Sequence, residues 1–182
     1  MADEVLGGHK SDAWIWALVI AATASVVGFA MVQGNRPAPE PPAMTAPPLM
    51  LQRLGGGNSA LPRGKVTVVD FWATWCGPCR FSMPRVQKLW QEYRPRGVEL
   101  YSVDTDDEAP TRDADVREFL LANHLTFPVV YDDGSASQAF SVANLPTMLL
   151  LDRKGSVVWT HVGALTENRE RELRAALDRA LR

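Results

Sequence analysis

The stretch that decides the fold runs Val66-Thr67-Val68-Val69-Asp70-Phe71-Trp72 and continues two residues later as Trp75-Cys76-Gly77-Pro78-Cys79. The first half is a continuous apolar run interrupted by Asp70, which is typical of a strand buried on both faces. Pro78 suits the first turn of a helix, because the N–H that it lacks would be unpaired there. The stretch therefore predicts a strand that leads into a helix, with two cysteines at the junction.

Cys76 and Cys79 are the only cysteines among the 182 residues. Free N–H groups and the dipole at a helix N-terminus favour a thiolate, which disulfide exchange needs. A zinc site needs about four ligands, and only His9, His124 and His161 could assist the pair. A structural disulfide across so short a loop would remove little chain entropy. We interpret the pair as a redox-active disulfide and expect no metal and no cofactor.

The N-terminal part of the chain contains an apolar segment. Residues 13–32 carry no charge, and about twenty apolar residues span the hydrocarbon core of a bilayer. We predict a transmembrane anchor there, after a short head of residues 1–12. The alternative is a cleaved signal peptide, with Lys10 as its basic residue and Ala22-Thr23-Ala24 as its cleavage site. Cleavage would leave the apolar residues 26–32 on the mature N-terminus, so we favour the uncleaved anchor.

Two further segments come after the anchor. Residues 33–48 are rich in proline and predict an extended linker, and residues 49–182 form the expected folded domain. The net charge of −2 comes without a basic cluster, which argues against a nucleic-acid partner. A short head and a long folded tail suit an anchor whose N-terminus is inside. We therefore expect the chain to cross the membrane once, with the domain facing the periplasm or outer surface.

Within the domain, strands alternate with helices and the pattern ends in a hairpin. This order predicts an α/β fold whose central mixed sheet is covered by helices on both faces. The expected strands are residues 49–54, 66–71, 98–103, 127–131, 147–151 and 157–162, and the expected helices are residues 79–94, from Asp113 or Asp115 to about His124, 135–140 and 167–181.

From residue 49 to its end, the chain resembles the thioredoxin-like proteins of the TlpA/ResA type, which are membrane-tethered thiol–disulfide oxidoreductases. Three stretches carry the resemblance: residues 68–80 around the cysteines, residues 140–147 (FSVANLPT) and residues 162–165 (VGAL). The extra helix and strand expected at residues 113–131 match the insertion that separates this group from plain thioredoxin. The resemblance implies a thioredoxin-like fold with that insertion.

The resemblance also implies roles for individual residues. Cys76 would attack the substrate disulfide and Cys79 would resolve the mixed disulfide. Pro146 would follow a cis peptide bond beside the disulfide, in a loop that pairs with the substrate backbone. The residues implied in substrate binding are Trp75, Gly77, Pro78, Leu145 and Pro146.

Asp70 lies six residues before Cys76 and matches the buried acid of thioredoxin. Burial in an apolar strand should raise the pKa of this carboxyl group, which could then accept the proton of Cys79. The chain departs from its relatives at Ser82, where many carry a glutamate, and we expect Ser82 to face inward. The strand at residues 98–103 also lacks the lysine that thioredoxin places near its acid. Acid–base work is therefore expected to depend on Asp70 alone.

The resulting functional hypothesis is a disulfide reductase, since the Gly-Pro pair between the cysteines is that of strongly reducing thioredoxin. The resemblance points to apocytochrome c or copper-site proteins as substrates, and to a membrane thiol reductant of the DsbD or CcdA kind. Two alternatives remain open: a disulfide oxidant of the DsbA kind, and a copper metallochaperone that would use His161.

Overall fold

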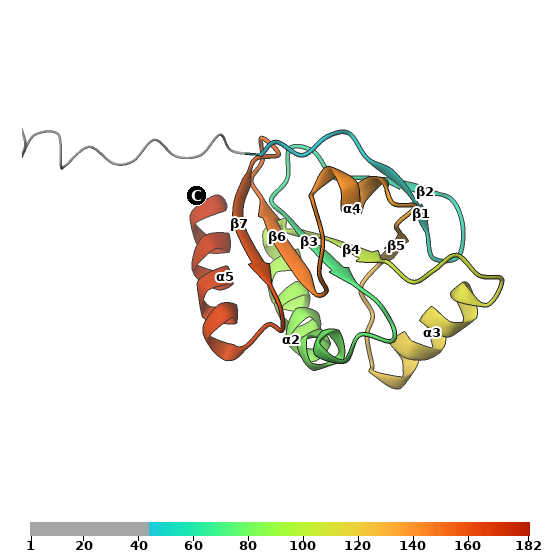
Figure 1. Cartoon of the computed structure of the whole chain (residues 1–182). Helices are drawn as coiled ribbons and strands as arrows, with labels where there is room; N and C mark the ends of the chain where they lie inside the picture. Colours follow the sequence, from blue (N-terminus) through green and yellow to red (C-terminus); the bar gives the residue numbers. More distant parts are fainter. Residues whose placement is uncertain (1–43) are drawn as a thin grey trace, which may run out of the picture. The chain divides into compact units, whose positions relative to one another are not determined.

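The computed structural model describes residues 44–182, which form a seven-stranded mixed sheet with helices on both faces (Figure 1). The order of strands across the sheet is β2-β1-β5-β4-β3-β6-β7. The elements are β1 (Met50–Arg53), β2 (Asn58–Ala60), β3 (Thr67–Trp72), α2 (Gly77–Tyr93), the 3₁₀ helix η1 (Arg94–Arg96), β4 (Glu99–Asp104), α3 (Arg112–Ala122), β5 (Val129–Tyr131), α4 (Ser135–Ala139), β6 (Thr147–Leu151), β7 (Val157–Val162) and α5 (Glu167–Ala180). The predicted α/β architecture and the extra helix and strand of the insertion are confirmed.

The central strand β3 explains why the sheet is covered on both sides. It pairs in parallel with β4 and antiparallel with β6, and all six of its residues are buried. Side chains alternate between the two faces of a strand. Val68 and Trp72 accordingly belong to the core beneath α2, α3 and α5, whereas Val69 and Phe71 belong to the core beneath α4. Asp70 shares the face of Val68 and Trp72, toward α2.

The helix α2 begins two residues earlier than predicted. Cys76 is its N-cap residue in extended conformation, and Pro78 stands in the first turn as expected. Gly97, with φ of 88°, ends η1 after α2 in the left-handed conformation that glycine adopts easily. The junction of β3 and α2 therefore places both cysteines at one helix N-terminus.

One strand was not predicted, and one helix cap was predicted wrongly. The short polar strand β2 pairs antiparallel with β1 at the sheet edge, although its sequence carries little apolar periodicity. The helix α3 is preceded by Thr111 rather than capped by Asp113 or Asp115. Asp113 lies in the first turn instead, where its carboxylate accepts the hydroxyl of Tyr131 at 2.5 Å.

The sheet has two ends, which we name by what they carry (Figure 1). At the disulfide end lie the carboxyl ends of the parallel strands β3, β4 and β5, with α2 beginning beside them. At the opposite, entry end lies the turn at residues 152–156 that joins β6 to β7, because β6 is antiparallel to β3.

The described chain joins the domain at this entry end. Ala46 is buried and donates its N–H to the carbonyl of Gly155 at 2.8 Å, and Val157 donates to the carbonyl of Met44 at 2.8 Å. Among the described residues, contacts with the sheet are thus already present at Met44, a few residues before the predicted boundary at residue 49. Between residues 44 and 182, no helix is both long and apolar enough to cross a membrane. The predicted head, anchor and most of the linker lie outside the described residues.

Candidate active site

A disulfide between Cys76 and Cys79 sits at the N-terminus of α2, with its Cα atoms 5.2 Å apart. The Sγ atom of Cys76 accepts the backbone N–H of Cys79 at 3.2 Å, so the sulfur caps the helix. Cys76 is 4% exposed and Cys79 is fully buried. A reagent in solvent can therefore approach only Cys76, and the helix N–H groups favour a thiolate there.

A groove of about 460 Å³ opens beside Cys76. It brings together five residues that the sequence placed in the site, Trp75, Cys76, Gly77, Pro78 and Leu145, and five that it did not, Thr105, Ser137, Val142, Ala143 and Asn144. Trp75 is 70% exposed, in contrast to the fully buried Trp72. The groove thus combines an approachable sulfur with an exposed aromatic side chain that a polypeptide can cover.

The opposite wall of the groove is a loop around a cis peptide bond between Leu145 and Pro146, which confirms the predicted cis geometry. The hydroxyl of Thr147 donates to the carbonyl of Asn144 at 2.6 Å and closes the loop. Gly163 donates its N–H to the carbonyl of Pro146 at 2.8 Å, which ties the loop to the end of β7. The loop is therefore held from both sides and presents Leu145 to the groove.

Asp70 is buried on β3, where only 2% of the residue is exposed. Its Oδ2 atom has no hydrogen-bond partner among the described residues. Burial raises the pKa of the carboxyl group to about 7. The predicted raised pKa is thus confirmed, and Asp70 can gain or lose a proton near neutral pH.

The segment between β3 and Cys76 is fixed by polar contacts from the end of β4. The N–H of Thr74 donates to both carboxylate oxygens of Asp106, at 3.1 and 3.2 Å. Both the N–H and the hydroxyl of Thr105 donate to the carbonyl of Trp72, at 2.8 and 3.0 Å. Since parallel strands end at the same edge, the position of Thr105 directly after the strand next to β3 is the signal that could have identified it.

A second buried carboxyl group, which the sequence did not reveal, lies at the end of β4. Asp104 is fully buried and pairs with Trp72 of β3 across the sheet. Its Oδ2 atom accepts Nε of Arg112 at 2.9 Å, while Oδ1 has no partner among the described residues. Burial, together with the charge of Asp106, raises the pKa of Asp104 to about 7 despite Arg112. Asp70 is therefore not the only carboxyl group in this part of the sheet that titrates near neutral pH.

Ser82 faces inward, as predicted, and is 3% exposed. Its hydroxyl donates to the carbonyl of Pro78 at 3.1 Å and accepts the backbone N–H of Leu165 at 2.8 Å. The side chain thus joins the first turn of α2 to the segment after β7. A serine in this position supplies a hydrogen-bond link, and it carries no proton that titrates near neutral pH.

His161, which the metallochaperone hypothesis requires, is half-buried on β7. Its Nε2 atom lies 3.1 Å from the carbonyl of Ala164. Across residues 44–182, the histidine, cysteine and acidic side chains form no group of three or more suited to a metal ion. The described geometry therefore gives this hypothesis no particular support.

Comparisons with known proteins agree with this site. The family model described as Redoxin matches residues 55–177, which is well over half of the chain. The thioredoxin-like protein YneN of Bacillus subtilis is 36% identical over 135 residues, covering 73% of this chain and 78% of the relative. The thiol-disulfide oxidoreductase ResA of Bacillus cereus is 32% identical over 155 residues, covering 82% of this chain and 87% of ResA.

Solved structures share the fold. A thiol:disulfide interchange protein from Chlorobium tepidum, described as a putative DsbE, superposes with a TM-score of 0.68 at 31% identity. The match covers 77% of this chain and 97% of that one. StoA from Bacillus subtilis gives a TM-score of 0.61 at 27% identity, covering 73% and 98%. With its Cys-x-x-Cys disulfide, the chain belongs to the Redoxin family, as a thiol–disulfide oxidoreductase of the TlpA/ResA type.

Proposed function

We propose that this oxidoreductase is a membrane-anchored reductase of protein disulfides. The observation that carries the proposal is the Cys76–Cys79 disulfide, which caps α2 at the edge of a groove walled by the cis-Pro146 loop. The Gly-Pro pair between the cysteines supports the reducing direction, because thioredoxin has the same pair and a potential of about −270 mV.

In the proposed reaction, the thiolate of Cys76 attacks one sulfur of a substrate disulfide. A bond forms between Sγ of Cys76 and that sulfur, and the other substrate sulfur leaves as a thiolate. The thiolate of Cys79 then attacks Sγ of Cys76, which releases the second substrate sulfur and forms the Cys76–Cys79 disulfide. Two electrons have passed from the protein to the substrate, and an external dithiol must return them.

Asp70 is the proposed proton acceptor for Cys79. The thiol of Cys79 must lose its proton before it can attack, and it is fully buried away from water. Asp70 points to the same face of the sheet as the core that contains Cys79, and its pKa of about 7 leaves it partly ionised at neutral pH. A base with a pKa near the working pH is well matched to this transfer.

The proposed partners come from the resemblance to the family. The substrates are protein disulfides, with apocytochrome c and copper-site proteins as the specific candidates. The electrons would come from a membrane thiol reductant of the DsbD or CcdA kind. The anchor at residues 13–32 would hold the domain on the periplasmic or outer side of a bacterial cytoplasmic membrane.

Trapping tests the reaction and identifies the substrate together. A Cys79→Ser variant cannot resolve the mixed disulfide, so it should accumulate covalent adducts through Cys76 that dithiothreitol releases. The matched control is Cys76→Ser, which keeps one cysteine but removes the approachable sulfur. Adducts of equal abundance on both variants would contradict the assigned roles.

The reduction potential tests the direction. Equilibration of the full chain with glutathione or dithiothreitol buffers should give a value near the thioredoxin potential of about −270 mV. A value near the DsbA potential of about −120 mV would instead make the protein an oxidant.

Impermeant thiol reagents test the location. After reduction, Cys76 should be labelled in intact spheroplasts. Labelling only after the membrane is permeabilised would place the domain in the cytosol, and no transmembrane reductant would then be needed.

A further inference from the structure

The described chain joins the domain at the end of the sheet opposite to the disulfide. Met44 and Ala46 bond to the turn between β6 and β7, at the entry end of the sheet. Cys76 lies at the other end of the sheet, after the carboxyl end of β3. Figure 1 shows the first described residues and the end of α5 at the top, and the start of α2 at the bottom.

Basic side chains gather at the entry end. They precede β3, follow α2, lie in the β6–β7 turn and end α5: Arg63, Lys65, Arg94, Arg96, Arg153, Lys154 and Arg179, all exposed. Three acidic side chains of this end are already engaged. Glu99 pairs with Lys65, Asp178 pairs with Arg96, and Asp152 accepts the backbone N–H groups of Lys154 and Ser156.

The remaining cations at this end have no carboxylate partner within residues 44–182: Arg63, Arg94, Arg153, Lys154 and Arg179. The disulfide end has the opposite character, since a second groove there is lined by Asp106, Asp107, Glu108, Asp132 and Asp133. The two ends of the domain therefore differ in the sign of their charge.

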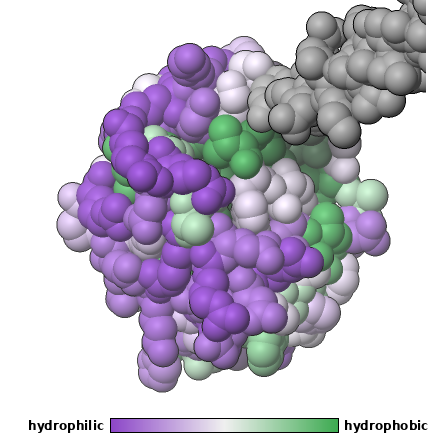
Figure 2. Space-filling model, turned by 90° about the vertical axis from the view of Figure 1, so that its left-hand side faces the viewer, coloured by the Kyte–Doolittle hydropathy of each residue, from purple (hydrophilic) through white to green (hydrophobic). Residues whose placement is uncertain are grey.

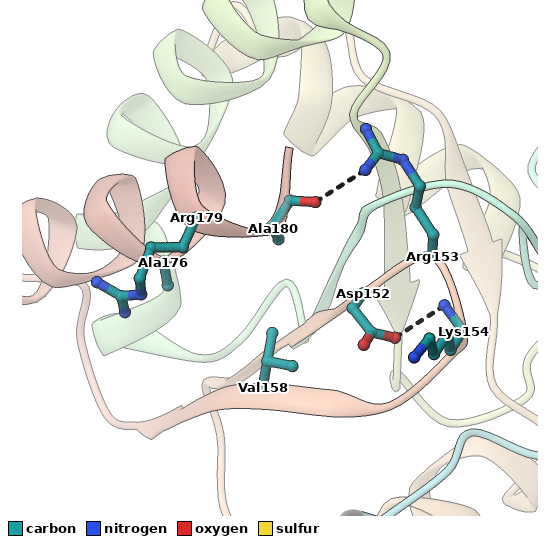
Figure 3. Close-up of a pocket in the computed structure, with 7 residues that line it drawn as sticks. All are labelled: Asp152, Arg153, Lys154, Val158, Ala176, Arg179 and Ala180. Carbon is teal, nitrogen blue, oxygen red and sulfur yellow. Dashed lines mark hydrogen bonds between the residues drawn. The ribbon is translucent and has the colours of Figure 1, made fainter. Parts of the chain in front are cut away.

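A hollow of about 480 Å³ lies among the basic residues of the entry end, between the β6–β7 turn and the last turns of α5 (Figure 3). Its rim carries Arg153, Lys154 and Arg179, against the single acid Asp152, and its apolar residues include Val158. Arg153 donates to the carbonyls of Ala180 and Leu181 at 3.2 and 3.1 Å, which fixes its guanidinium at the rim.

The surface around the hollow is suited to a lipid–water interface. Val158 is 47% exposed on β7 beside the cations, and Figure 2 shows hydrophobic groups set into the otherwise hydrophilic face of the molecule over α5 and β7. Arginine binds phosphate oxygens in a bidentate manner, and exposed cations are attracted to anionic lipid surfaces.

We propose that the entry end is a membrane-facing surface that binds anionic phospholipid headgroups, with Arg153, Lys154 and Arg179 as the headgroup site. The proposal rests on the membrane anchor proposed above. The occupant is the bilayer, because the chain enters the domain beside the hollow and the charges there complement anionic lipid. Docking in this orientation turns Cys76 and its groove away from the membrane, toward protein substrates.

The test uses the full chain in nanodiscs and measures amide hydrogen exchange of residues 153–158 and 176–181. In discs enriched in phosphatidylglycerol, exchange there should slow at least about fivefold relative to phosphatidylcholine discs. This is about the factor in membrane-binding affinity that one cation near an anionic surface contributes. The protection should disappear at molar salt, where the screening length falls to about 3 Å.

A triple variant, Arg153→Gln, Lys154→Gln and Arg179→Gln, should lose the protection. The matched control neutralises three exposed arginines elsewhere, Arg117→Gln, Arg169→Gln and Arg171→Gln, and should keep it. Equal loss in both variants would overturn the site. Protection by inorganic phosphate in phosphatidylcholine discs would show a free-phosphate site and overturn the membrane assignment.

The readout does not involve the cysteines, so it is independent of the redox chemistry. A chain that inserts into the discs but shows no lipid-dependent protection overturns the surface and leaves the anchor standing. A chain that fails to insert overturns the anchor, and the surface with it.

Discussion

The layer beneath the disulfide and the neighbouring junction of β4 and α3 each bury one aspartate. Asp70, beneath α2, has a pKa raised by burial alone, and no cation within residues 44–182 balances it. Asp104 is buried as deeply, but it faces Arg112 at 2.9 Å, and the guanidinium of Arg112 lies over the ring of Tyr131 at 4.4 Å. The comparison teaches that one region keeps an unbalanced carboxyl group beside the redox pair, whereas the other uses its carboxyl group to join a strand to a helix.

The largest expected effect is the loss of the Arg112 partner. Arg112→Gln should destabilise the domain by about 3 to 5 kcal/mol at pH 8, because it leaves the buried carboxylate of Asp104 without its cation. Chemical unfolding measures the change. The control is Arg117→Gln, which breaks the exposed pair with Asp113 and should cost less than about 1 kcal/mol. Equal effects of the two variants would remove the distinction between a buried and a surface pair.

Asp70→Asn should change the free energy of unfolding in the opposite direction and stabilise the domain. The folded pKa of about 7 lies above the ordinary value of 3.8, so the folded state favours the protonated form. The protonated carboxyl group of Asp70 therefore contributes fully to stability below about pH 4, and this contribution is lost as the pH rises to 7 and beyond. The variant should therefore gain little at pH 4 and on the order of 3 kcal/mol at pH 8.

Unfolding of the wild type and Asp70→Asn across this pH range measures the gain. Asp104→Asn is the companion variant, and it should gain less than Asp70→Asn, because the loss of the charged partner of Arg112 offsets the gain from removing a buried carboxylate. A gain from Asp70→Asn that does not change with pH would mean that Asp70 is not an unbalanced, titrating group.

The same substitution should slow turnover. Asp70→Asn removes the proposed proton acceptor of Cys79, so reduction of insulin at pH 7 should fall by roughly tenfold to a hundredfold, at or below the lower end of general acid–base effects. The pH profile of the variant should also lose the step near pH 7. A step that persists in Asp70→Asn and disappears in Asp104→Asn would identify Asp104, at the junction of β4 and α3, as the titrating group and would contradict the role of Asp70.

The smallest expected effect concerns the link between α2 and the segment after β7. Ser82→Ala leaves the buried N–H of Leu165 without its acceptor, which should cost about 1 to 2 kcal/mol. The loss should be the same at pH 5 and pH 8, since Ser82 does not titrate there. A loss that depends on pH would mean that the hydroxyl acts through Asp70 rather than through the helix link.

The parts of the site that could be predicted from sequence are those set by local order. A buried apolar strand, a proline in the first helical turn and two cysteines at the junction fix Cys76, Cys79 and Asp70 within fifteen residues. The Leu145-Pro146 loop was predicted from its resemblance to the family. What these share is that each lies next to a recognisable motif.

The rest depends on which strands become neighbours. Asp104 and Thr105 enter the site because β4 lies parallel to β3, and their sequence shows no motif of its own. Ser137 reaches the groove from α4 on the other side of the sheet. The pair of Asp104 and Arg112 crosses a loop whose course no periodicity predicts, which is why acid–base chemistry was expected to depend on Asp70 alone.

The central claim is that Cys76 attacks and Cys79 resolves, and alkylation of the reduced protein tests it most directly. The reduced full chain would be treated with limiting iodoacetamide near neutral pH, and the modified peptides counted by mass spectrometry. Cys76 caps α2 and is the less buried sulfur, so it should be modified first, with a pKa below the ordinary value of about 8.5. Modification of Cys79 before Cys76 would contradict the account.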